Sequence, residues 1–138
     1  SYQDNQFKGK KILLVDDDIR NIFALSSVLE NYSMKVTFAE NGRQALEITQ
    51  QQTDFDIILM DIMMPEMDGY EATKLIKASE KYAKNKIPII AVSASAFDED
   101  IQNAKKAGID DFLAKPIESD KLKELLIKYA PKYKSATS

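Results

Sequence analysis

Five polar residues follow short apolar runs in this chain, and their types suit phosphoryl or metal chemistry. They are Asp16 and Asp17 after ILLV, Asp61 after DIILM, Ser93 after PIIAV and Lys115 after DFLA. Three carboxylates in one place repel one another unless a cation joins them or one takes up a proton. Carboxylate oxygens with room for water suit Mg²⁺. An Asp carboxylate beside Mg²⁺ and an ammonium group can accept a phosphoryl group, because both cations neutralise charge on that group.

Each of these residues also has an ordinary structural explanation. Asp is common after strands because it favours turns and caps helices, and Asp18 fits a helix cap with no further role. Ser93 could cap a helix, and Lys115 could be a solvated surface amine. The combination favours a site, since these polar groups follow runs that are otherwise apolar.

The elements that must bring these residues together can be predicted from the same apolar runs. Strands are predicted at 11–15, 34–38, 56–60, 88–92 and 111–114, and a helical pattern follows each of them. Continuous apolar strands joined by helical crossovers indicate a doubly wound α/β fold, with a parallel sheet covered on both faces. Ligands of such sheets bind outside the carboxyl ends of the strands. The polar residues should therefore meet at one rim.

Size and composition limit the classes of function. The 138 residues fit one domain. We expect a lead-in or linker at 1–9, the domain at 10–130 and a flexible tail at 131–138. No apolar run reaches the roughly 18 residues of a membrane span, and no signal peptide opens the chain, so we expect a cytoplasmic protein without membrane contact.

The net charge and the absence of two residue types narrow the possible classes of function further. The net charge of −3 and the dispersed Lys residues argue against nucleic acid as a direct partner. The chain has no Cys, which excludes thiolate chemistry, and no His, which excludes a histidine base or phosphoryl carrier. Histidine kinase activity is therefore excluded for this chain.

From about Lys11 to Tyr129 the chain resembles the receiver domains of two-component response regulators. The motifs that carry the resemblance are VDD at 15–17, LMDIMMPEMDG at 59–69, AVSASA at 91–96 and DDFLAKPI at 110–117. The resemblance implies a (βα)5 flavodoxin-like fold with strand order 2-1-3-4-5.

The resemblance also implies a role for each site residue. Asp61 would be the phosphoacceptor, and Lys115 and Ser93 would contact the phosphoryl group. Mg²⁺ (or Mn²⁺) would be held by Asp16, Asp17, Asp61 and the backbone carbonyl of Met63, with Asp16 acting largely through water. Ser93 and Phe112 would form the switch, and Phe112 lacks the hydroxyl of the Tyr that is frequent in the family. The Lys115–Pro116 bond would be cis.

The implied function is to take a phosphoryl group from a phosphohistidine onto Asp61 and to relay or read out the signal. The resemblance implies no catalysis beyond self-phosphorylation and slow autodephosphorylation. The partners would be a histidine kinase dimerisation/phosphotransfer domain and a histidine phosphotransfer domain. The run DIRNIFALSSVLE at 18–30 is most similar to receivers of hybrid sensor histidine kinases, and a stand-alone response regulator is the alternative. We expect partner contact at Ile19, Pro116 and Ile117, and expect Ile22 and Phe23 to lie in the core.

Proteins of other classes stay open as alternatives. The haloacid dehalogenase-like phosphatases carry a D-x-D motif after a strand, which 16–18 would fit. In that family a Thr/Val–Leu pair would stand in place of Ile19–Arg20, and Asp61 and Ser93 would have no matching roles. A flavodoxin-like FMN binder shares the architecture, but no Ser/Thr/Gly-rich phosphate loop follows the first strand. A degenerate receiver that only binds partners is disfavoured by the complete acid, hydroxyl and Lys set.

Overall fold

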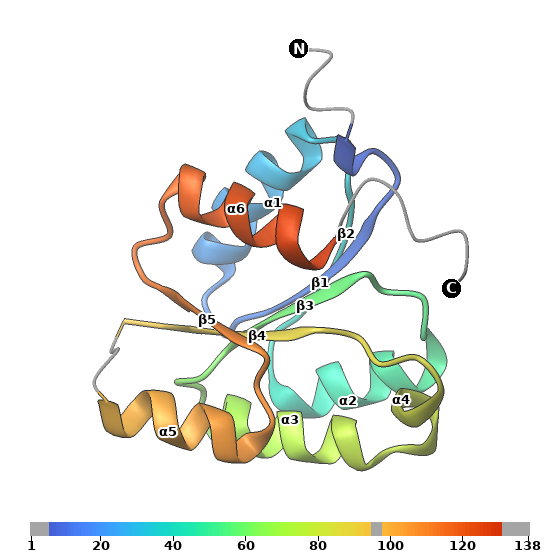
Figure 1. The fold of residues 1–138 in the computed structure, drawn as a ribbon, viewed down its shortest axis with the longest axis vertical. Helices are drawn as coiled ribbons and strands as arrows, with labels where there is room; N and C mark the ends of the chain where they lie inside the picture. Colours follow the sequence, from blue (N-terminus) through green and yellow to red (C-terminus); the bar gives the residue numbers. More distant parts are fainter. Residues whose placement is uncertain (1–5, 95–97, 131–138) are drawn as a thin grey trace.

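A computed structural model describes residues 6–94 and 98–130 and shows a five-stranded parallel sheet in the order β2-β1-β3-β4-β5 (Figure 1). The elements are β1 (Lys11–Val15), α1 (Ile19–Asn31), β2 (Lys35–Ala39), α2 (Gly42–Gln51), β3 (Ile57–Asp61), α3 (Gly69–Ala78), α4 (Glu80–Lys84), β4 (Ile89–Ser93), α5 (Asp98–Ala107), β5 (Asp111–Ala114) and α6 (Ser119–Tyr129). The predicted fold class and strand order are confirmed.

Helices cover both faces of the sheet, α1 and α6 on one side and α2 to α5 on the other (Figure 1). The side chains of β1 alternate between the two faces. Ile12 and Leu14 join an apolar cluster that includes Leu29 of α1 and three leucines of α6. Leu13 and Val15 join a second cluster, on the face covered by α2 and α3. Burial on both faces explains why the central strands are continuous apolar runs.

Three strands end one residue later than the sequence predicted. Asp61 and Ser93 are the last residues of β3 and β4, not the first residues after them. Asp61 pairs with Val92 across the sheet, and Ser93 pairs with Ala114. Pairing uses backbone groups, so a polar side chain can extend a strand that hydropathy alone would end.

Two helix boundaries follow local sequence signals. Asp18 caps α1, as predicted, and its carboxylate accepts a hydrogen bond from the Arg20 backbone N–H at 3.0 Å. Gly108, predicted to end α5, has a φ of +90°, a conformation that favours glycine. The short helix α4 was not predicted, because five residues are too few to show an amphipathic pattern. Phe97 and Pro131, expected to mark a helix and a helix stop, lie outside the described residues.

Packing extends to residues that precede the first strand. Phe7, in the segment expected to be a lead-in, is fully buried. Its ring lies 5.4 Å from that of Tyr32 in an edge-to-face arrangement. The backbone N–H of Gly9 donates to the carbonyl of Ser33 at 2.9 Å.

None of the helices in the described ranges combines the length and the apolar character that a membrane span requires.

Replacing Phe7 should therefore destabilise the whole domain. We expect Phe7→Ala to lower the free energy of unfolding by about 3 kcal/mol or more, the usual cost of removing a buried aromatic ring. The urea denaturation midpoint measures this loss. Phe38→Ala is the matched control, because Phe38 is 47% exposed and its loss should cost less than about 1 kcal/mol. Equal midpoints for the two variants would contradict the role of Phe7.

Candidate functional site

The carboxyl ends of β1 and β3 bring three acidic side chains together, on the side where β4 leads toward α5 (left in Figure 1). Asp16, Asp17 and Asp61 each offer a carboxylate oxygen, and these oxygens all lie within 4.8 Å of one another. Asp61 is buried, Asp16 is partly buried and Asp17 is exposed. The predicted meeting of these residues at one rim is confirmed.

The ammonium group of Lys115, just after β5, lies between two of these carboxylates. Its Nζ is 3.5 Å from Asp16 Oδ2 and 3.4 Å from Asp61 Oδ1. The two contacts cross the sheet from its β5 edge, and they span 99 and 54 residues of sequence. The positive charge of Lys115 thus partly neutralises the negative charges of Asp16 and Asp61.

Backbone donors orient the same carboxylates. Asp16 Oδ1 accepts a hydrogen bond from the Asp18 N–H at 2.8 Å, and Asp61 Oδ1 accepts one from the Met63 N–H at 3.3 Å. The side chain of Met63 is 72% exposed beside the cluster. Fixed N–H donors hold the oxygens in place without adding a net charge.

The carboxylate of Asp61 is electrostatically strained without a cation. Burial and the negative charge of Asp16 raise the pKa of Asp61 to about 6, although Lys115 and the Met63 N–H act in the opposite direction. A divalent cation would favour the ionised form of all three acids. The set of hard oxygen donors, part buried and part open to water, fits Mg²⁺.

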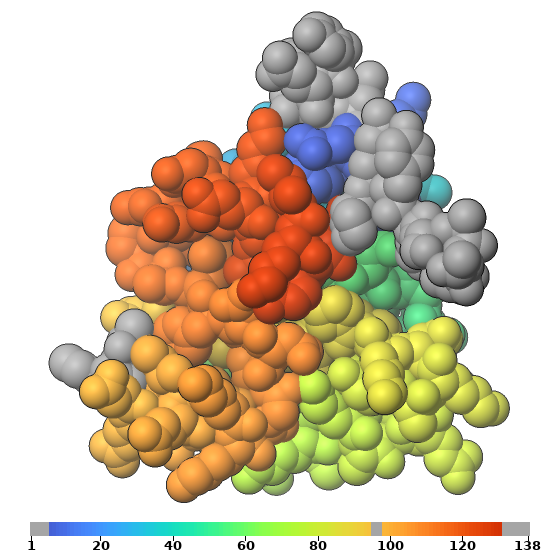
Figure 2. All heavy atoms as spheres, viewed as in Figure 1, coloured from blue at the N-terminus to red at the C-terminus, as the bar shows by residue number. Residues whose placement is uncertain are grey.

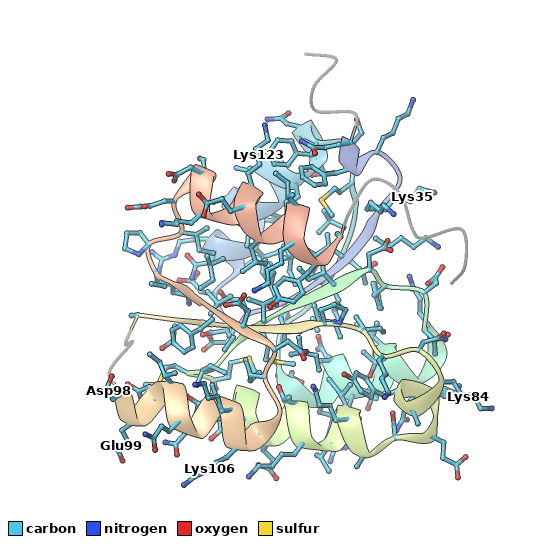
Figure 3. All side chains as sticks on the ribbon, viewed as in Figure 1. Lys35, Lys84, Asp98, Glu99, Lys106 and Lys123 are labelled. Carbon is cyan, nitrogen blue, oxygen red and sulfur yellow. The ribbon has the colours of Figure 1, made fainter. Side chains whose placement is uncertain are left out.

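Acidic residues elsewhere on the same side are not part of this cluster. Asp98 and Glu99, in the first turn of α5, are exposed and point outward from the body of the protein (Figure 3). Within the described part of the chain, the group of acids that could share a metal ion is limited to Asp16, Asp17 and Asp61.

A glycine allows the close approach that positions Asp61. A Cβ on Gly69, the first residue of α3, would lie within 2.4 Å of the Asp61 carbonyl oxygen. The Gly69 N–H donates to the Ile62 carbonyl at 3.1 Å. Any side chain at position 69 would push α3 away from the end of β3. This role was missed from the sequence, where the MDG motif was its only signal.

The predicted switch residues lie on neighbouring strands. Ser93 ends β4 and is 3% exposed, and its carbonyl accepts the Lys115 N–H at 2.9 Å. Phe112 in β5 pairs with Ala91 and packs, partly buried, against the cluster on the α2 and α3 face. The backbone pairing of β4 with β5 therefore connects Ser93 with Lys115 and Phe112.

The residues predicted to contact a partner lie at the same rim. Ile19 is 40% exposed, Pro116 is exposed and Ile117 is partly buried. The Lys115–Pro116 bond is cis, as the resemblance implied. The prediction that Phe23 lies in the core was wrong, since Phe23 is 64% exposed while Ile22 is buried. Each helical residue turns the side chain by about 100°, so Ile22 faces the sheet and Phe23 faces solvent.

A cavity of about 500 Å³ opens beside the acidic cluster, between α1 and the loop that joins β5 to α6. Its walls are mostly apolar and include Leu25, Val28 and Ile117, while Asp16, Asn21 and Lys115 line its polar part. The Asn21 side-chain amide lies 3.4 Å from Asp16 Oδ2. The sequence analysis did not identify Asn21, because a single Asn on a helix has no distinctive signal.

Known proteins are similar to this chain in both sequence and fold. A sequence profile described as the response regulator receiver domain matches residues 12–127. The signal transduction histidine-protein kinase BarA of Escherichia coli K12 is 39% identical over 120 residues, which cover 87% of this chain. The chain spans only 13% of the length of BarA, and 14% of the length of the probable histidine kinase 4 of Oryza sativa subsp. japonica and of the sensor protein GacS of Pseudomonas syringae pv. syringae.

Two solved structures are similar over most of their length. The receiver domain of the sensor histidine kinase PA1611 from Pseudomonas aeruginosa PAO1 has a magnesium ion in its active-site cleft. It matches with a TM-score of 0.79 and 37% identity, covering 88% of this chain and 97% of that one. The co-crystal of the yeast histidine phosphotransfer protein Ypd1 with the receiver domain of Ssk1 matches with a TM-score of 0.80 and 26% identity, covering 89% and 90%.

The strain at Asp61 predicts an unusual pH dependence of stability. Its pKa in the folded protein, about 6, lies above the ordinary value of an Asp carboxyl, which is about 4, so the folded state binds more protons between these values. The metal-free protein should therefore lose stability as pH rises from about 4 to about 6, by up to about 3 kcal/mol.

Asp61→Asn imitates the protonated carboxyl and should be more stable than the wild type at pH 8, with the gain vanishing near pH 4. Urea denaturation in a chelator at pH 4, 6 and 8 measures the difference, and saturating Mg²⁺ should remove most of it at pH 8. A gain that stays the same at all three pH values would show that Asp61 is not strained.

Proposed function

Because this chain belongs to the response regulator receiver family, we propose that Asp61 accepts a phosphoryl group from a phosphohistidine in a Mg²⁺-dependent reaction. The observation that carries the proposal is the position of Lys115 Nζ, 3.5 Å from Asp16 and 3.4 Å from Asp61, beside three carboxylates within 4.8 Å of one another. An acidic acceptor, two further acids and an ammonium group are the parts that phosphoryl transfer to a carboxylate requires.

In the proposed reaction an Asp61 oxygen attacks phosphorus. The bond from phosphorus to the imidazole nitrogen breaks, the bond to the carboxylate oxygen forms, and the nitrogen takes up a proton. Asp61 must be ionised to attack, which a pKa of about 6 allows at neutral pH. The Lys115 ammonium neutralises charge on the phosphoryl group, and the Ser93 hydroxyl donates to one of its oxygens.

We assign the metal-holding role to Asp16, Asp17, Asp61 and the backbone carbonyl of Met63, with Mn²⁺ as a substitute ion. When bound, the cation supplies positive charge next to the transferring phosphoryl group. That a similar receiver domain, from PA1611, contains magnesium in its cleft supports this assignment. The phosphoryl group adds about −1.5 to −2 charges, which we expect to draw Ser93 inward and to let Phe112 repack.

We further propose that the chain is the receiver of a hybrid histidine kinase, acting in the cytoplasm without direct contact to nucleic acid or membrane. The identity to BarA and PA1611 supports this origin, and a stand-alone response regulator is the alternative. The domain would cover 10–130, extended at its start by the packing of Phe7. The phosphoryl group would come from the histidine of a kinase dimerisation/phosphotransfer domain or pass to a phosphotransfer protein, as the complex of Ypd1 with Ssk1 suggests.

The rim formed by Ile19, Pro116 and Ile117 is the proposed docking surface for this partner. Pro116 and Ile117 line the cavity beside Asp16 and Lys115, and Ile19 begins the helix that follows the acids of β1. We expect the donor histidine to enter on this side. Phe23, one helical turn after Ile19 and 64% exposed, extends the apolar surface along α1.

Phosphorylation of the purified chain tests the proposal directly. Incubation with acetyl phosphate and Mg²⁺ should add one phosphoryl group, seen by intact mass. Asp61→Asn should remove the added mass, and Lys115→Ala should reduce its yield at least tenfold, because the charge on the phosphoryl group is no longer compensated. Chelation of Mg²⁺ should abolish the reaction, and Mn²⁺ should restore it. An unchanged yield for Asp61→Asn would refute the assignment of the acceptor.

A variant of the docking surface should slow phosphoryl transfer from a partner protein without slowing phosphorylation by a small molecule. Ile19→Ser should slow transfer from phosphorylated yeast Ypd1, used as the donor probe, by about three- to tenfold, because it removes an exposed apolar contact. The rate with acetyl phosphate should stay unchanged. Ile127→Ser is the matched control, since Ile127 is also exposed but lies near the end of α6. Equal transfer rates for the two variants would exclude α1 from the interface.

A further inference from the structure

We propose that Asn21 is a positioning residue of this site, whose side-chain amide holds the carboxylate of Asp16 in its metal-binding orientation. The inference rests on the proposed function, since it assumes that Asp16 helps to bind Mg²⁺. Neither the motifs of the sequence nor the comparisons assign a role to Asn21.

The contact arises from the start of α1. Asn21 stands in the first turn of the helix that Asp18 caps, and its Nδ2 lies 3.4 Å from Asp16 Oδ2. Side chains of an α-helix tilt toward its N-terminus. A residue in the first turn can therefore reach back over the cap to Asp16, the first residue after β1. The cap thus fixes the distance between Asn21 and Asp16.

The donors around Asp16 show what Asn21 adds. Asp16 Oδ1 is held by the Asp18 N–H at 2.8 Å, while Oδ2 faces both Asn21 Nδ2 and Lys115 Nζ. In the proposed reaction Lys115 turns toward the phosphoryl group and leaves Asp16. The amide of Asn21 then remains as a donor to Oδ2. Asn21 would thus orient Asp16 together with Lys115 in the unphosphorylated site, and would remain its side-chain donor after Lys115 has turned away.

The chemistry of an amide suits this place. An acidic residue at position 21 would add a fourth negative charge to the cluster, and a Lys would compete with the metal for the carboxylates. An amide donates a hydrogen bond and carries no charge. Asn21 is itself exposed, so its bond adds little to the stability of the fold. Its replacement should therefore change metal binding far more than it changes stability.

Calorimetric titration of the whole chain with Mg²⁺, with no phosphodonor present, tests the inference. Asn21→Leu keeps the approximate size and removes the donor, and it should weaken Mg²⁺ binding about tenfold, as is typical when the residue that orients a metal ligand is lost. Asn21→Gln keeps the donor and should recover most of the affinity. Asn31→Leu, at the exposed other end of α1, is the matched control and should bind as the wild type does.

The outcomes separate the two proposals. If the wild type binds Mg²⁺ and Asn21→Leu binds it equally well, the role of Asn21 is refuted while the metal site stands. If Asn21→Gln binds as weakly as Asn21→Leu, donation by the amide is refuted. If the wild type itself binds no Mg²⁺, the proposed metal site fails, and the role of Asn21 fails with it. Urea midpoints of the Asn21 variants should match that of Asn31→Leu, and a lower midpoint would refute a role confined to the site.

Discussion

The repulsion among Asp16, Asp17 and Asp61 is the constraint around which this domain is organised. Lys115 relieves part of it by lying within 3.5 Å of two of the carboxylates. Burial, together with the remaining repulsion from Asp16, raises the pKa of Asp61. The strands that carry the acids are buried on both faces. Their apolar burial contributes most of the stability of the fold and offsets the free energy of this repulsion.

Under the proposed function, docking would involve the start of α1 and the β5–α6 loop, while readout would involve β5 and its neighbours. The exposed apolar residues of α1 lie beside the acidic rim, on one side of β1. The residues of β5 lie at the far edge of the sheet, and Figure 2 shows α5, β5 and α6 as one continuous surface. A change in charge at Asp61 can reach that surface through Ser93 and the β4–β5 ladder. Under the proposed function, the acidic cluster would thus connect the docking of a donor with a change at the β5 edge.

Much of this arrangement follows from sequence because its causes are local or topological. Buried strands give apolar runs, and a parallel sheet brings their ends together, which was enough to place Asp16, Asp61 and Lys115. The predictions from sequence were wrong or incomplete where the burial of a residue depends on distant parts of the chain. Phe23 has the hydropathy of a core residue, but the direction of α1 turns it to solvent, and Phe7 is buried by residues that follow it much later. Close approaches such as that of Gly69 depend on three-dimensional distances that no pattern encodes.

The contact between Lys115 and Asp16 spans 99 residues and closes across the sheet. Closing a contact of such long sequence separation costs the entropy of the intervening chain. A nascent or partly folded chain would hold the acids of β1 and β3 without the ammonium group that follows β5. Under the proposed function, full competence for phosphoryl transfer would therefore require that β5 has joined the sheet.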